Sequence, residues 1–180
     1  MTPTNRKLLL GGAVVLGVLV LAGGAQALSP SSPTSRDFDA LASMLVAETS
    51  FSAAPNEMAQ IVFIAVNRAN RWGVPIYSVV AGPRPKPGTN PWNDSALYKA
   101  LSNGARSKNE DRWQAARAFA KNVVEGGSYR NLGFTGFVHP GAMPVPPCAS
   151  NRVATSTIAG TRCIPTWVAN GKTVGKGLFA

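Results

Sequence analysis

The sequence predicts an α+β domain that is mainly helical, has short strands near its C-terminus and follows an apolar N-terminal segment. Apolar residues recur at spacings of three and four in several segments between residues 36 and 125, which indicates amphipathic helices. Beyond Gly127, glycine, aromatic and β-branched residues predominate, as in short strands and loops. Residues 8–27 carry no charge, so they are distinct from the domain that follows.

Composition narrows the class of protein and its partners. The chain has 180 residues, 45% of them hydrophobic and 14% charged, which fits one globular domain and excludes a disordered chain. Its formal net charge is +10, and the basic residues are scattered without forming a run. Scattered positive charge suits a diffuse polyanion, so nucleic acid, an anionic membrane surface and an anionic cell wall are all open alternatives.

Residues 1–27 predict export. Arg6 and Lys7 precede the apolar stretch 8–24, and Ala25-Gln26-Ala27 is a small-x-small cleavage site. The alternative is a retained membrane anchor, because about 20 apolar residues can cross a bilayer. Five glycines in this stretch weaken the anchor interpretation. In both cases the positive flank stays inside and the rest crosses the membrane. We therefore expect a protein of the periplasm or cell envelope, secreted or held in the inner membrane.

The remaining chain divides into a Ser/Pro linker, residues 28–35, and one domain, residues 36–180. Turn and capping signals set the expected boundaries, such as Ser35 as an N-cap, Pro55 at a helix start and Gly73 as a stop. The expected elements are helices over 36–48, 55–72, 76–81, 95–101 and 111–125, a long loop over 82–94, a short strand over 133–139, a loop-rich tract over 140–167 and a terminal strand over 171–180.

Glu48 interrupts the apolar stripe of the first helix. Phe38, Leu41 and Leu45 define that stripe, and continuing it by three residues reaches Glu48. A carboxylate in the last turn also opposes the helix dipole. Partial burial would raise its pKa, as a general acid at neutral pH requires. The alternative is a frayed helix end whose Glu48 side chain points into water.

The other acidic residues have ordinary explanations, except Asp94, which adjoins a loop tryptophan. Six of them suit helix starts or positions beside loops and basic residues: Asp37, Asp39, Glu57, Glu110, Asp111 and Glu125. In this interpretation Glu57 is simply an acidic residue in the first turn of the second helix.

The chain contains one histidine, His139, and two cysteines, Cys148 and Cys163. Zinc hydrolases typically use two or three histidines, so we expect no metal site. A Cys-His peptidase would need a free thiol beside His139. In an exported protein the two cysteines are better explained as a disulfide, which stabilises a fold by about 3 kcal/mol at this separation.

The loop over residues 82–94 ends in Trp92 and Asn93. Four prolines and two glycines exclude regular structure there, and a long loop in a compact domain is usually functional or disordered. The flat face of Trp92 suits the apolar face of a sugar ring. Its alternative role is that of a lid over the core.

Eight segments together resemble the SleB-type cell-wall hydrolases, a family that includes spore-cortex-lytic enzymes and related phage and proteobacterial lysins. They occur in the family's order and approximate spacing: LASMLVAETS (41–50), IVFIAVNRA (61–69), PIYSVVAG (75–82), PWND (91–94), RWQAARAFAKNVVEGG (112–127), FVHPGAM (137–143), PTW (165–167) and VGKGLF (174–179). Two departures stand out. The family's second Glu, four residues after the first, would fall within 49–52, and its histidine near the last strand corresponds to Gly177.

The resemblance implies a lysozyme-like α+β fold and cleavage of the glycan strand of peptidoglycan. It implies that Glu48 is the essential acid and base. The expected partners are peptidoglycan glycan strands, and the membrane through residues 8–27 if that segment is retained. We expect no cofactor, no nucleic acid and a monomeric protein. The protein would be encoded by a bacterium that remodels its own wall or by a phage.

The expected reaction is cleavage between N-acetylmuramic acid and N-acetylglucosamine. A two-carboxylate glycosidase needs a second acid about 5 Å or 6.5–9.5 Å away, and only Asp94 is a candidate. A single Glu fits a lytic transglycosylase, which makes a 1,6-anhydro product. Trp92, Phe137 and Trp167 would contact sugar rings, with Asn93 and His139 as hydrogen-bonding groups, although Phe137 and Trp167 also suit the core. The alternatives are a hydrolytic muramidase and a non-catalytic wall-binding or virion structural module.

Overall fold

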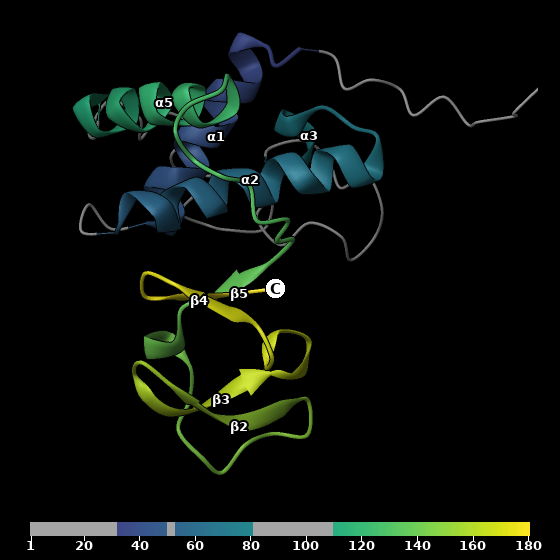
Figure 1. Ribbon diagram of the computed structural model, residues 1–180, viewed down its shortest axis with the longest axis vertical. Coiled ribbons are helices and arrows are strands. Elements are labelled where there is room, and N and C mark those ends of the chain that lie inside the picture. Colours follow the sequence, from purple (N-terminus) through teal and green to yellow (C-terminus); the bar gives the residue numbers. More distant parts are fainter. Residues whose placement is uncertain (1–31, 50–52, 81–109) are drawn as a thin grey trace, which may run out of the picture.

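The computed structural model describes residues 32–49, 53–80 and 110–180 (Figure 1). Its helices are α1 (Ser35–Glu48), α2 (Pro55–Trp72), α3 (Ile76–Val80) and α5 (Glu110–Val124), with short 3-10 turns η3 (Pro140–Ala142) and η4 (Thr166–Val168). Its strands are β1 (Phe137–Val138), β2 (Arg152–Thr157), β3 (Gly160–Pro165), β4 (Lys172–Val174) and β5 (Gly177–Phe179). The prediction of a mixed helix and strand domain is confirmed, with the strands following the helices.

The start of α1 shows why this segment is helical. Thr34, not Ser35 as predicted, is the N-cap, and it forms a capping box with Asp37. The second carboxylate oxygen of Asp37 accepts a hydrogen bond of 2.8 Å from the backbone N–H of Tyr77, which ties α1 to α3. The predicted stripe is buried: Phe38 is 5% exposed, and Leu41 and Leu45 are fully buried.

Helix α2 has the boundaries that its Pro and Gly signals predict. Pro55 occupies its first turn, and Gly73, with φ of 64°, terminates it in the left-handed conformation. One face of α2 packs into the helical core. Another edge is polar and binds the chain that follows α5: Gln60 donates to the carbonyl of Arg130, and Arg68 donates to that of Thr135. This polar edge holds the C-terminal part of the chain against the helices.

The strands form two small antiparallel sheets below the helices (Figure 1). In the first, β5 lies between β1 and β4, and Phe137 pairs with Phe179. The second is the β2–β3 hairpin, with Arg152 opposite Pro165 and Thr157 opposite Gly160. We call residues 137–180 the C-terminal lobe. The prediction of a single terminal strand over 171–180 is wrong, because this segment folds back at Gly175 into β4 and β5.

The β2–β3 hairpin is a second difference from the sequence prediction, which gave only loop in this tract. The predicted disulfide between Cys148 and Cys163 is confirmed, and it joins β3 to the segment before β2. The lobe has its own small core of Ile164, Val168 and Leu178, separate from the helical core. The lobe is therefore a minor packing unit attached to a helical layer.

Several predictions lie outside the described residues. These are the export or anchor segment 1–27, most of the linker, the loop 82–94 and the helix 95–101. No helix within residues 32–49, 53–80 and 110–180 is long and apolar enough to cross a membrane.

Candidate active site

Glu48 is the last residue of α1, and its side chain is partly buried. Burial raises the pKa of Glu48, because removing a carboxylate from water disfavours its charged form. The positive charge of protonated His139 acts in the opposite direction and lowers the pKa, but by less than burial raises it. Glu48 is therefore a carboxyl group that holds its proton to higher pH than an exposed glutamate, beside a group that can stabilise its anion.

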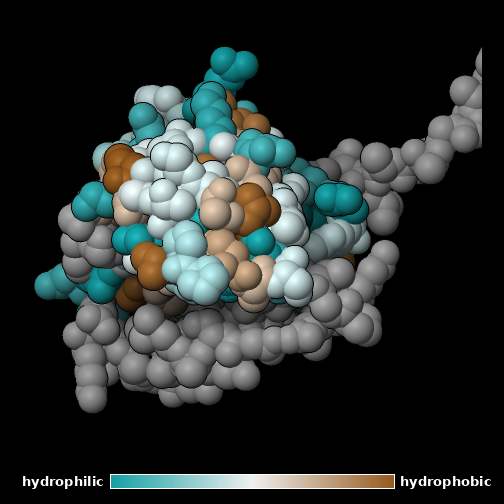
Figure 2. Space-filling view, turned by 90° about the horizontal axis from the view of Figure 1, so that it is seen from below, coloured by the Kyte–Doolittle hydropathy of each residue, from teal (hydrophilic) through white to brown (hydrophobic). Residues whose placement is uncertain are grey.

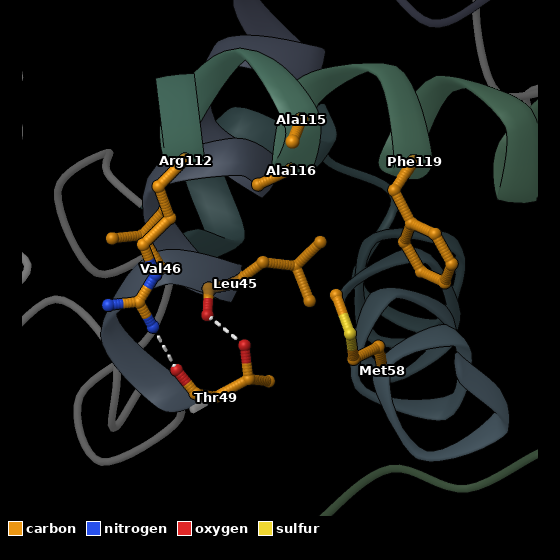
Figure 3. Close-up of a pocket in the computed structure, with 8 residues that line it drawn as sticks. All are labelled: Leu45, Val46, Thr49, Met58, Arg112, Ala115, Ala116 and Phe119. Carbon is orange, nitrogen blue, oxygen red and sulfur yellow. Dashed lines mark hydrogen bonds between the residues drawn. The ribbon is translucent and has the colours of Figure 1, made fainter. Parts of the chain in front are cut away.

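Arg112 supports the helix end on which Glu48 lies. Its guanidinium Nη2 donates a hydrogen bond to the carbonyl of Thr49, and Thr49 Oγ1 donates to the carbonyl of Leu45 at 2.6 Å (Figure 3). These bonds satisfy terminal carbonyls of α1, and the cation of α5 offsets the negative end of the helix dipole. The last turn of α1 has no basic residue of its own, so an acidic residue can occupy that turn because a neighbouring helix supplies the cation.

His139 lies beside a second carboxylate, Glu57. The two atoms His139 Nδ1 and Glu57 Oε1 are 3.4 Å apart, and Glu57 is only 1% exposed. The other oxygen, Oε2, accepts a hydrogen bond of 3.0 Å from the backbone N–H of Lys176. Among the described residues Oε1 has no hydrogen-bond partner, and the imidazole lies beside it. A buried carboxylate in this position orients the imidazole ring.

The turn between β4 and β5 is shaped around Glu57. A Cβ atom on Gly175 would lie 2.4 Å from Glu57 Oε2, and one on Gly177 would lie 3.1 Å from Oε1. Gly175 also has a φ of 59°, which side-chain-bearing residues rarely adopt. The glycines of this turn thus allow the backbone to close over the carboxylate. Gly177 thus lies close to the Glu57 carboxylate.

Phe137 supports His139 from the side. The two rings meet edge to face with centroids 5.4 Å apart, and Phe137 stacks on Phe179 at 5.5 Å. One face of Phe137 is therefore used by the helical core, and a sugar could reach only what remains of the ring. Of the residues predicted from sequence, His139 and Phe137 are in contact, and His139 lies near enough to Glu48 for its charge to act on that carboxyl. Trp92, Asn93 and Asp94 lie outside the described residues.

Sequence reasoning missed Glu57 as part of this cluster. An acidic residue in the first turn of a helix is common, because it complements the dipole, so Glu57 carried no distinctive signal. The available signal was the glycine spacing in VGKG, 174–177, which permits close approach of backbone to another group. That spacing does not say which group approaches.

An apolar pocket of about 200 Å³ lies between α1, the first turn of α2 and α5 (Figure 3). Its lining is apolar apart from a threonine and an arginine: Leu45, Val46, Thr49, Met58, Arg112, Ala115, Ala116 and Phe119. Glu48 does not line it, so this pocket adjoins the end of α1 without containing the acid. Among the described residues, no three His, Cys, Asp or Glu side chains gather as metal ligands would.

The cluster consists of one partly exposed carboxyl, one half-exposed imidazole and one buried carboxylate. Such a set can give a proton to a substrate, hold the resulting anion and take a proton back. In comparisons with known proteins, no family model matches the chain, and no curated protein or solved structure matches it significantly.

Proposed function

We propose that this protein is a peptidoglycan-degrading lytic transglycosylase of lysozyme-like fold, exported to the cell envelope, with Glu48 as its only acid and base. The observation that carries the proposal is the partly buried Glu48 carboxyl, whose pKa is raised by burial. A carboxyl with a raised pKa is what protonation of a glycosidic oxygen near neutral pH requires. The resemblance of eight segments to SleB-type hydrolases supports the same residue and the same substrate.

The reaction can be written with Glu48 alone. Its carboxyl proton passes to the glycosidic oxygen as the bond from that oxygen to C1 of N-acetylmuramic acid breaks. The Glu48 carboxylate then accepts the proton of the muramic 6-hydroxyl, and the 6-oxygen bonds to C1. The product is a 1,6-anhydro sugar, no water is consumed, and Glu48 ends protonated as it began.

His139 stabilises the intermediate state of this cycle. Between the two proton transfers Glu48 is an anion, and the positive charge of His139 lowers the pKa of that carboxyl. Glu57 keeps His139 in place, with 3.4 Å between Nδ1 and Oε1. Glu57 is in this account a positioning residue, since it acts through His139 and not on the sugar.

Burial argues against Glu57 as a second catalytic carboxylate. A nucleophile must reach C1 of the sugar, and a hydrolytic base must reach a water on the opposite face of the ring. Glu57 is 1% exposed, and one of its oxygens is hydrogen-bonded to the Lys176 backbone. With Glu57 engaged in this way, a mechanism with one working acid is favoured, and this is the specific reason to prefer a transglycosylase over a muramidase.

The direct test is Glu48→Gln, assayed by the release of soluble muropeptides from purified peptidoglycan. The change keeps the size of the side chain and removes the proton donor, so we expect activity to disappear while the circular dichroism spectrum stays the same. The matched control is Glu125→Gln, because Glu125 is half exposed and pairs with Lys121 on the surface of the same helix end. It should leave activity intact. Undiminished turnover by a folded Glu48→Gln protein would refute the proposal.

A further inference from the structure

The C-terminal lobe has an unusual charge. It contains four basic residues, Arg152, Arg162, Lys172 and Lys176, and neither Asp nor Glu. All eight acidic residues of the chain lie at position 125 or earlier. The charged side chains of the lobe are therefore all basic, and they would attract anionic polymers over distances of about a Debye length.

Trp167 is a fixed and exposed aromatic ring on this lobe. It is 58% exposed, yet a Cβ on Gly136 would lie 2.6 Å from its Cζ3 atom. The indole thus lies directly against the backbone of Gly136. That backbone is itself held by two hydrogen bonds with Ala180, and the next residue after the tryptophan, Val168, is fully buried. The ring is preorganised, so a ligand that stacks on it loses little conformational entropy.

We propose that the C-terminal lobe is a second binding surface, separate from the Glu48 cluster, for an anionic glycan, with Trp167 as the platform for a sugar ring. The basic residues would contact carboxylates carried by the polymer. In taking peptidoglycan as the glycan, the proposal rests on the proposed function. The surface holds substrate and takes no part in bond cleavage.

The position of the Trp167 platform separates it from the acid. In β1, Phe137 packs against the helical core, whereas Val138, on the opposite face, packs against the core of the lobe. A Cβ on Gly136, the residue before β1, would point at Trp167, so Trp167 lies on the other face from Phe137, the ring that meets His139. A long polymer can reach both faces around the sheet edge, whereas a short glycan fragment would occupy only one site at a time.

The competing partner for such a surface is an anionic membrane. Ile158 at the tip of the β2–β3 hairpin is 70% exposed, and Figure 2, viewed from this end, shows brown hydrophobic side chains among pale ones, with hydrophilic groups mostly around them. However, Trp167 is a fixed ring held against the backbone of Gly136, and its flat face suits the apolar face of a sugar. The wall polymer is therefore the favoured partner.

The test is cosedimentation of the full chain with purified peptidoglycan sacculi, using Glu48→Gln as the background so that the polymer stays intact. Trp167→Ala should weaken binding about tenfold or more, as the loss of an aromatic anchor does. The matched control is Ile158→Ala, a similar removal of an exposed apolar side chain from the same lobe, and it should bind as the background does. Binding should also weaken as salt increases.

Two results would contradict the proposal that Trp167 binds a sugar ring. One is equal binding by Trp167→Ala and the background protein. The other is loss of binding in Ile158→Ala together with cosedimentation on vesicles containing anionic phospholipid, which would assign the lobe to a lipid surface. Cleavage of short soluble glycan fragments by the otherwise unaltered chain separates this proposal from the proposed function. If binding depends on Trp167 but no fragment is cleaved, only the proposed enzymatic activity is refuted. If fragments are cleaved but binding does not depend on Trp167, only the proposed binding role of Trp167 is refuted.

Discussion

The helical layer buries one continuous apolar core that runs through α1, α2, α3 and α5, whereas the core of the C-terminal lobe consists of Ile164, Val168 and Leu178. The lobe is instead held by the Cys148–Cys163 disulfide, and the backbone N–H of Lys176 bonds it to Glu57 of α2. The segment just before the lobe is bonded to the polar edge of α2 through the carbonyls of Arg130 and Thr135. The candidate site spans the two regions. Glu48 and Glu57 come from helices, while His139 and the turn over Glu57 come from the lobe and its sheet. Glu48 is therefore carried by the larger helical core, whereas the position of His139 depends on the smaller C-terminal lobe.

The largest expected effect comes from the helical core. Leu41 is fully buried in α1, and Leu41→Ala should lower the free energy of unfolding by about 2–5 kcal/mol through lost burial and a cavity. Val145→Ala in the lobe is the control, because Val145 is 60% exposed, and it should change stability by about 0.5 kcal/mol or less. Denaturant titrations of both variants measure the contrast. Similar losses for the two would contradict the burial of Leu41 in the helical core.

Loss of the disulfide should destabilise the lobe more than the helices. Replacing both Cys148 and Cys163 by alanine should lower the free energy of unfolding by about 3 kcal/mol, as expected for a 15-residue separation. Hydrogen exchange followed by mass spectrometry should show faster exchange in β2 and β3, with α1 and α2 still protected. Uniformly faster exchange throughout the domain would mean that lobe and helices unfold as one unit.

The dependence of activity on pH tests whether His139 of the lobe acts on Glu48 of the helical layer. A general acid acts in its protonated form, so activity should fall as pH rises through the pKa of Glu48. His139⁺ lowers that pKa, so removing it raises the pKa, and His139→Asn should move the fall in activity to higher pH. Glu57→Gln should shift it in the same direction, because the carboxylate that holds His139 in place is lost. A shift to lower pH would contradict the assigned role of His139.

The helices could be predicted from sequence because their signals are local. The stripe of Phe38, Leu41 and Leu45, the proline at position 55 and the glycine at 73 are each recognisable within one or two turns. The partial burial of Glu48 could be expected for the same reason, since it continues an apolar stripe within one helix.

The lobe and the second carboxylate could not be predicted in this way. The hairpin strand Ala154-Thr155-Ser156-Thr157 consists of small and polar residues without apolar alternation, and its turn, Ile158-Ala159, lacks the usual Asn-Gly signal. Its pairing is supported by the disulfide and by burial of Ile164. Glu57 is buried by a turn more than a hundred residues further along the chain, through its bond to Lys176. No local pattern records such a contact.

The identity of the reaction product tests the central claim most directly. Muropeptides released from sacculi by the purified protein should be analysed by mass spectrometry, where a 1,6-anhydro end is lighter than a reducing end by one water molecule. One working acid, Glu48, predicts 1,6-anhydro ends, and it predicts that Asp94→Asn, outside the described residues, costs little turnover. Reducing ends, together with loss of activity in Asp94→Asn as complete as in Glu48→Gln, would contradict the account and establish a two-carboxylate muramidase.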